Sequence, residues 1–90
     1  MNQDIKTEFS APPKLYRIGD VVRNTSFTRQ TIHNYTIMGL IEESTWTEGG
    51  HRLYDESVFE KLWQIEQLRK SKTLAQIRDL FRSERMVGIS

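Results

Sequence analysis

Apolar side chains at helical spacing mark the first structured element of the chain. Ile18, Val21 and Val22 follow an i, i+3, i+4 pattern, which predicts a short helix over about residues 17–24. A polar turn comes next, and Phe27 at its end is expected to enter the core and fix the turn. The pattern therefore predicts a brief helix that leads directly into a tight turn.

A second helix is predicted over about residues 28–38. Thr28 is a good N-cap because its hydroxyl can accept a free backbone N–H of the first turn, and Gly39 is a good stop. At about 100° per residue, Ile32 and Tyr35 become the anchors on the side that faces the core. The inner side comprises Thr28, Thr31, Ile32, Tyr35 and Met38, and the outer side comprises Arg29, Gln30, His33, Asn34 and Ile37.

A β-hairpin is predicted after the second helix. One strand is expected over residues 40–47, anchored by its first two apolar residues, and a Glu-Gly-Gly turn leads to a returning strand over residues 51–54. Alternation places Arg52 and Tyr54 on one face of the returning strand. Trp46 lies in the first strand, where it could touch DNA near the hairpin, but packing on neighbouring helices is the favoured expectation.

Two further helices complete the pattern. Asp55 is expected to cap the first of them, whose inner stripe comprises Val58, Phe59, Leu62, Ile65 and Leu68. Residues 70–72 form a polar break, and Thr73 with Gln76 forms a capping box for the last helix. The inward residues of that last helix are Leu74, Ile77, Leu80 and Phe81.

These elements predict a mostly α-helical fold with a small β-hairpin. A short helix, a tight turn, a second helix, a two-stranded wing and two further helices describe a winged helix-turn-helix. The expected organisation is a flexible N-terminal arm over residues 1–14, one domain over residues 15–86, and a C-terminal tail over residues 87–90.

Composition supports a single small globular domain. Of the 90 residues, 37% are hydrophobic and 28% are charged, which is typical of a folded rather than a disordered chain. The absence of cysteine excludes disulfides and thiolate metal sites, and no apolar run is long enough to span a bilayer. We therefore expect no metal, no cofactor and no membrane, and a location in the cytoplasm in association with the nucleoid.

The net charge of +1 conceals a segregation of charge along the chain. Residues 14–40 contain four basic side chains and a single acidic one, Asp20. The basic residues are Lys14, Arg17, Arg23 and Arg29. Phosphate contacts are local, so a nearly neutral protein can bind nucleic acid when its bases cluster on one side.

The outer side of the second helix carries side chains that can read base edges. An arginine such as Arg29 can bridge the two acceptors of guanine, and Gln30 or Asn34 can pair with the donor and acceptor of adenine. The polar side of an isolated helix is usually just exposed to solvent, without a binding role. Directly after a short helix and a tight turn, however, this face indicates a recognition helix.

Five short motifs occur in an order that resembles the MerR-type transcription regulators, over residues 15–81. They are Tyr16-Arg17-Ile18-Gly19-Asp20, Thr31-Ile32-His33-Asn34-Tyr35, Gly39-Leu40-Ile41, Gly50-His51-Arg52-Leu53-Tyr54 and Thr73-Leu74-Ala75-Gln76-Ile77. The resemblance implies double-stranded DNA as the partner, a recognition helix in the major groove, and two wings on the phosphate backbone. The DNA-binding residues predicted in this way are Arg17, Thr28, Arg29, Gln30, His33, Asn34, Tyr35, His51, Arg52, Lys70 and Lys72.

The chain also departs from the family's pattern. Ser26 stands where the family usually has glycine in the turn, so a strained or altered turn is expected. His33-Asn34-Tyr35 replaces the usual Arg-Tyr-Tyr, which predicts lower affinity and an unusual sequence preference. Family members normally continue into a long pairing helix and an effector-sensing region. We therefore expect either a fragment of a longer regulator or a naturally short protein, with any homodimer formed on DNA or through segments absent from this chain.

Two other classes of function remain open at this stage. One is an excisionase-like recombination cofactor that bends DNA, and the other is a protein-interaction module built on the acidic residues 42–48 and on Ile37. An enzyme is not expected, because His33 and His51 have no evident orienting partner.

Overall fold

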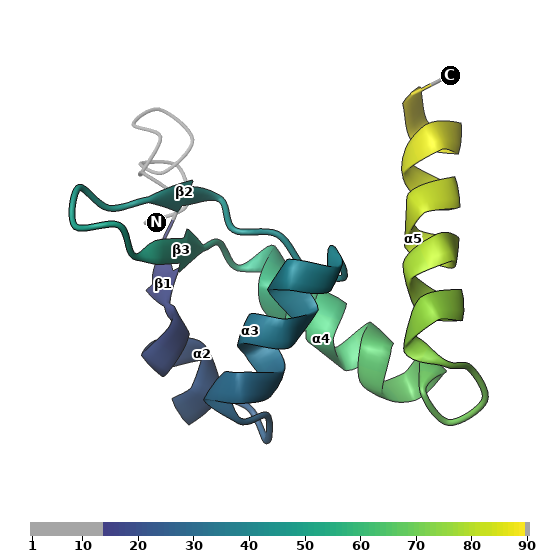
Figure 1. Cartoon of the computed structure of the whole chain (residues 1–90), viewed down its shortest axis with the longest axis horizontal. Coiled ribbons are helices and arrows are strands. Elements are labelled where there is room, and N and C mark those ends of the chain that lie inside the picture. Colours follow the sequence, from purple (N-terminus) through teal and green to yellow (C-terminus); the bar gives the residue numbers. More distant parts are fainter. Residues whose placement is uncertain (1–13, 90) are drawn as a thin grey trace, which may run out of the picture.

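The computed structural model describes residues 14–89 of the chain, with a small sheet at one side, helices next to it, and the last helix at the opposite side (Figure 1). Apart from Lys14, the expected N-terminal arm lies outside the described residues, as does Ser90. In chain order the elements are β1 (Tyr16–Arg17), α2 (Ile18–Arg23), α3 (Arg29–Met38), β2 (Thr45–Trp46), β3 (Arg52–Tyr54), α4 (Ser57–Leu68) and α5 (Leu74–Ile89). The predicted winged helix-turn-helix fold is confirmed.

The turn between α2 and α3 is held by local hydrogen bonds. The hydroxyl of Thr25 donates to the carbonyl of Val21 at 2.8 Å and accepts the N–H of Phe27 at 3.3 Å. Within residues 14–89, positive φ occurs only at glycine, so Ser26 needs no left-handed backbone. The expectation of strain at Ser26 is wrong, because the threonine hydroxyl organises this turn.

Both predicted ends of α3 are confirmed. The hydroxyl of Thr28 accepts the N–H of Thr31 at 3.1 Å, which satisfies a backbone donor of the first turn. Gly39 closes the helix in the left-handed conformation, with φ of 83°. Each end of the helix is therefore defined by a residue that suits it: a threonine that caps the first turn and a glycine that adopts positive φ.

Replacing Gly39 with alanine should lower the free energy of unfolding by about 1 kcal/mol, because an L side chain at positive φ is strained. A Cβ at Gly39 would meet no atom within 4 Å, so the loss would come from the backbone alone. Gly39→Asn is the matched variant and should lose less, since asparagine tolerates this conformation. Urea unfolding followed by circular dichroism measures both, and equal stability of Gly39→Ala and the parent would contradict the assignment.

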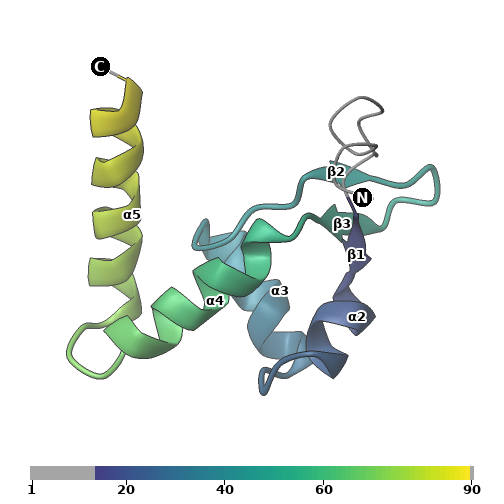
Figure 2. The same ribbon diagram turned by 180° about the vertical axis from the view of Figure 1, so that it is seen from behind.

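The sheet has one strand more than predicted. Its strand order is β1-β3-β2 (Figure 2), with antiparallel pairing throughout. In the register, Tyr16 lies opposite Tyr54. The two-stranded wing is thus corrected to a three-stranded sheet, in which β1 ties the start of α2 to the wing. Strand β1 has only two residues, which are too few to show an alternating pattern.

The strand predicted over residues 40–47 is confirmed only at Thr45–Trp46. Leu40 and Ile41 are buried, but their N–H groups donate to the carbonyl of Tyr35 at 2.9 and 3.4 Å. Their backbone therefore completes the end of α3, and their side chains fill the core without entering the sheet.

The core lies where α2, α3, β3, α4 and the first half of α5 meet. Its fully buried side chains are Val21, Ile32, Tyr54, Ile65 and Ile77. Asp55 accepts the N–H of Ser57 at 2.9 Å at the start of α4, in agreement with its predicted capping role. The capping box of α5 is also confirmed, with bonds of 2.8 and 3.2 Å between Thr73 and Gln76. Helix α5 continues through Ile89, into the segment expected as a tail.

Candidate nucleic-acid interface

Three elements surround one hollow of about 560 Å³ on the surface of the domain. They are the start of α2, the amino-terminal half of α3 and the tip of the wing. Six predicted DNA-binding residues line this hollow: Arg17, Arg29, Gln30, His33, His51 and Arg52. The fold thus gathers residues from distant parts of the sequence onto one surface, which we call the basic hollow.

Positive charge predominates in the basic hollow. Four arginines line it, and Asp20 is its single acid. The Asp20 carboxylate forms an ion pair with Arg23 and accepts the N–H of Arg17 at 3.0 Å. Arg23 was not among the predicted residues, although its i, i+3 spacing from Asp20 could have indicated the pair. Asp20 is thus paired with Arg23, Arg52 lies 3.9 Å from Glu43, and the four arginines together outnumber the acid that lines the hollow.

The polar face of α3 is exposed, as predicted. Arg29, Gln30, His33 and Asn34 all lie on the solvent side, while Ile32 is fully buried. The Gln30 amide donates to the Asn34 carbonyl oxygen at 3.0 Å, so these two amides are aligned along the helix. This side of α3 therefore presents hydrogen-bonding groups at the spacing of one helical turn.

Arg29 lies beside the first turn of α2. A Cβ built on Gly19 would be 3.4 Å from its Nη2, so the guanidinium passes close over the glycine. The exposed side chain thus lies at the boundary between the two helices of the helix-turn-helix. Thr28 is exposed at the start of α3, but its hydroxyl is used in capping and in a 2.9 Å bond to Thr31.

Tyr35 does not belong to the exposed face. Only 3% of its surface is accessible, and its ring packs edge-on against Phe27 at 5.9 Å between centroids. Its hydroxyl accepts a long hydrogen bond of 3.4 Å from Arg69. The expectation that Tyr35 is a core anchor is confirmed, and the structure offers no exposed surface for the groove contact that the resemblance implied.

The wing presents a cluster that the sequence pattern did not predict. Trp46 is 49% exposed and its indole N–H donates to Glu43 at 3.1 Å, so the expectation that it packs on helices is wrong. The guanidinium of Arg52 lies 4.7 Å from the centroid of the Trp46 ring. Trp46 and Arg52 are opposite each other in the register of the hairpin, and no helix within residues 14–89 buries the indole.

Lys70 and Lys72 are exposed in the turn between α4 and α5, away from the basic hollow. Lys70 donates to the side chain of Gln67 at 3.0 Å. In both views the turn that carries the lysines and the turn between α2 and α3 lie at the lower end of the domain (Figures 1 and 2). The predicted second wing is therefore at the same end as the start of α3.

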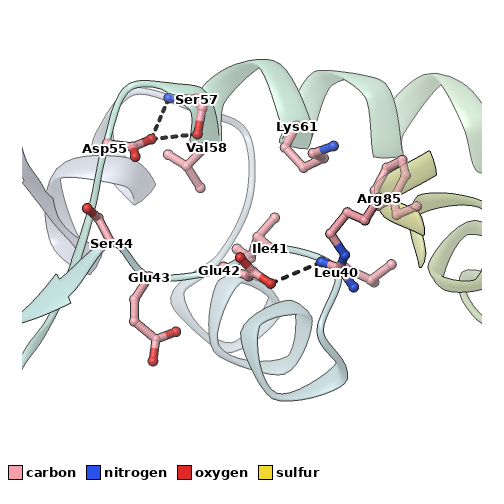
Figure 3. A pocket seen from close by; sticks show the side chains of 11 residues that line it. Leu40, Ile41, Glu42, Glu43, Ser44, Asp55, Ser57, Val58, Lys61 and Arg85 are labelled. Atoms are coloured by element: carbon pink, nitrogen blue, oxygen red, sulfur yellow. Dashed lines mark hydrogen bonds and ion pairs between the residues drawn. The ribbon is translucent and has the colours of Figure 1, made fainter. Parts of the chain in front are cut away.

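A second hollow of about 370 Å³ lies between residues 40–44, which follow α3, the start of α4, and α5 (Figure 3). Arg85 reaches from α5 to Glu42 at 3.0 Å, and the Lys61 ammonium lies 4.2 Å from the centroid of the Phe81 ring. These contacts tie α5 to the body of the domain. None of the predicted DNA-binding residues lines this hollow.

Across residues 14–89, no three His, Cys, Asp or Glu side chains are grouped so that they could hold a metal ion. No helix in the same range has the length and apolar character needed to cross a membrane.

Comparison with known sequences gives one consistent family. The sequence profile of the MerR HTH family regulatory proteins matches residues 16–84. The nodulation protein NolA of Bradyrhizobium elkanii is 40% identical over 55 residues, which cover 61% of this chain and 25% of NolA. The HTH-type transcriptional regulator ZntR of Escherichia coli (strain K12) is 37% identical over 67 residues, which cover 73% of this chain and 48% of ZntR. The chain thus spans about a quarter to a half of these relatives.

Solved structures agree with the sequence comparison. A MerR-family transcriptional regulator from Bacillus cereus superposes with a TM-score of 0.67 at 26% identity, over 76% of this chain and 52% of that structure. The N-terminus of MtaN, the Bacillus subtilis multidrug transporter activator, gives a TM-score of 0.68 at 27% identity, over 73% of this chain and 63% of that structure.

Proposed function

The chain belongs to the MerR HTH family of regulatory proteins, and we propose that its domain binds a specific sequence of double-stranded DNA to regulate transcription. The observation that carries this proposal is the basic hollow. It joins the exposed face of α3 to arginines of α2 and the wing, and engages its single acid internally. A recognition helix flanked by cations is the arrangement that the major groove and its phosphate borders require.

Within this proposal the residues divide by role. Arg29, Gln30, His33 and Asn34 face the base edges, with Arg29 suited to guanine and the aligned amides suited to adenine. Arg17 and Arg52, on the paired strands β1 and β3, hold phosphates beside α3, and His51 precedes Arg52 in the wing. Lys70 and Lys72 bind the backbone at the second wing. Thr28 acts as the cap that fixes the start of the helix.

The proposal extends to assembly and location. We infer that the DNA-binding unit corresponds to residues 15–86, that two copies pair on DNA or through segments outside this chain, and that the protein acts at the nucleoid. We assign it no catalytic step. Its relatives are regulators, and His33 and His51 are both exposed at the basic hollow.

The two alternative functions have less support. An excisionase-like cofactor is not favoured, because the profile and the solved structures are those of MerR-family regulators. The protein-interaction alternative relied on the acidic residues 42–48 and on Ile37. Ile37 is 63% exposed, but Glu42 is paired with Arg85, and Glu43 accepts from Trp46 and lies near Arg52. Much of the acidic stretch is thus used within the domain.

The direct experiment is enrichment of bound sites from a random duplex pool, followed by sequencing. We expect one recurrent half-site, with pairs in inverted orientation if two copies bind together. Direct repeats with cooperative bending would indicate the recombination cofactor. If no sequence is enriched at low salt, and titration with duplex leaves the amide signals of α3 unshifted, the proposal is wrong.

Arg52→Ala should weaken binding to all duplexes by a similar factor and reduce the slope of log K against log salt by about one. The reason is that Arg52 would hold a phosphate and carry no sequence information. Fluorescence anisotropy at several salt concentrations measures the slope. Arg82→Ala is the matched control, because Arg82 is exposed on α5 and does not line the basic hollow. An unchanged slope for Arg52→Ala would remove Arg52 from the interface.

A further inference from the structure

The exposed indole of Trp46 has no role in the fold that explains its position. Tryptophan is usually well buried, because a large apolar ring gains most from leaving water. Trp46 nevertheless remains 49% exposed, on a strand of two residues. It lies opposite Arg52 in the register of the hairpin, so the two side chains project from the same face of the sheet.

The indole is held in a defined orientation. Its N–H donates to Oε2 of Glu43 at 3.1 Å, and Nε of Arg52 lies 3.9 Å from the same oxygen. The centre of the guanidinium lies 4.7 Å from the ring centroid, within the range of a cation–π contact. Arg52 also lines the basic hollow. Trp46 therefore stands at the rim of the hollow, fixed beside the arginine that points into it.

We propose that Trp46 is a further DNA-binding residue: its indole contacts the deoxyribose of the nucleotide whose phosphate Arg52 binds. This inference rests on the proposed function. A phosphate and its own sugar are covalent neighbours, so a cation and an adjacent ring match the two parts of one nucleotide. The C–H face of the sugar is apolar and suits an aromatic surface, while the indole N–H stays on Glu43. The contact is independent of base identity.

Charge around the two tryptophans favours DNA at Trp46 and disfavours it at Trp63. Trp63 is 60% exposed on α4, but it lies one turn from Glu60 and from Glu66. Trp46 adjoins Arg52 of the basic hollow, and the charge of Glu43, which accepts the indole N–H, is offset by the same arginine 3.9 Å away. The chain contains only these two tryptophans, so each can be made the sole indole of a variant.

The test uses Trp63→Phe, which leaves Trp46 as the only tryptophan, and the matched variant Trp46→Phe, which leaves Trp63. On addition of the enriched duplex, the fluorescence of Trp63→Phe should fall and its quenching constant for acrylamide should drop about twofold or more. Neither quantity should change for Trp46→Phe. If Trp46 stays equally accessible to acrylamide in the DNA complex, the proposal is overturned.

A second measurement distinguishes a direct contact between Trp46 and DNA from a role in which Trp46 only positions Arg52. Trp46→Ala should bind duplex about three- to tenfold more weakly, with the salt slope of the parent, because no charge is lost. A slope reduced by about one, as expected for Arg52→Ala, would mean that the ring only positions the arginine, and would overturn the sugar contact. Partial recovery of affinity in Trp46→Phe would support it.

The outcomes also distinguish this inference from the proposed function. If Arg29→Ala and Arg52→Ala lose affinity while Trp46 remains accessible and Trp46→Ala binds normally, DNA binding stands and the tryptophan contact is wrong. If neither arginine variant differs from the parent, the proposed function itself fails. If Trp46 becomes protected only when a protein partner is added, its surface serves that partner and the DNA contact is rejected.

Discussion

Replacement of Arg29 by alanine is expected to weaken binding to the preferred duplex by about tenfold or more and to relax the choice of base at one position. Arg29 is exposed at the start of α3, and its guanidinium passes over Gly19 between the two helices of the helix-turn-helix. From this position it can offer two parallel donors to a guanine. The loss of these two donors therefore removes the preference for guanine at one position, in addition to a positive charge.

The measurement is a repeat of the pool enrichment with Arg29→Ala, together with affinities for the parent's best site and for its single-base variants. One position of the site should lose its preference, while binding to unrelated duplexes falls less. Arg29→Lys is the informative companion, because it keeps the charge but loses the planar fork of donors. If Arg29→Ala lowers all affinities equally and the preferred sequence is unchanged, Arg29 binds phosphate and the assignment of the reading face must be revised.

The helices could be predicted from the sequence because their determinants are local. In α3, the cap at Thr28, the stop at Gly39 and the buried Ile32 all lie within one short window, and each takes the predicted role. The capping box of Thr73 with Gln76 is similarly contained in four consecutive residues. Signals of this kind do not depend on how distant segments pack.

The sheet was harder to predict because its determinants are distant in the chain. Strand β1 exists through the pairing of Tyr16 with Tyr54, and nothing near Tyr16 specifies that partner. Leu40 and Ile41 were assigned to a strand because a short apolar pair has the same appearance in a strand and at a buried helix end. Hydrogen bonds to the carbonyl of Tyr35 decide between the two, and they form only in the folded structure.

The candidate site shows the same division. Sequence periodicity correctly assigned the exposed face of α3 and its buried anchors Ile32 and Tyr35, but it was wrong for Thr28, which is exposed as the N-cap. For Tyr35, the periodicity indicated a core anchor, whereas the family resemblance implied a groove contact, and the buried ring agrees with the periodicity. The exposure of Trp46 could not be decided from local pattern, because it depends on how the helices of residues 14–89 pack relative to a two-residue strand. The contributions of individual residues to DNA binding remain predictions.

The largest loss of stability is expected at Tyr54, the side chain that joins the wing to the recognition helix. Tyr54 is fully buried and is the largest of the side chains below 2% exposure. Its hydroxyl lies 2.7 Å from the hydroxyl of Thr36. Because Thr36 donates its one proton to the carbonyl of Ile32 at 2.8 Å, the Tyr54 hydroxyl is the donor in the shared bond.

Tyr54→Ala should therefore lower the free energy of unfolding by about 3–5 kcal/mol, since it removes a buried ring and leaves a cavity. Tyr54→Phe should lose only about 1 kcal/mol, because the ring stays and a single hydrogen bond is lost. Urea unfolding at constant pH measures both. The free energy of unfolding of a domain of this size is small enough to be comparable with this loss, so Tyr54→Ala is expected to be largely unfolded at 37 °C.

A double-mutant cycle with Thr36→Val isolates the hydrogen bond between α3 and the wing. If the bond contributes to stability, Tyr54→Phe in the Thr36→Val background should cost about 0.5 kcal/mol or more less than in the parent. The folded Tyr54→Phe protein should also retain the salt slope of the parent, because Arg52 stays in place while the ring still fills the core. Strict additivity of the two substitutions would show that wing and helix are joined by packing alone. A stable, DNA-binding Tyr54→Ala protein would show that the wing does not depend on this residue, contrary to its complete burial between β3 and α3.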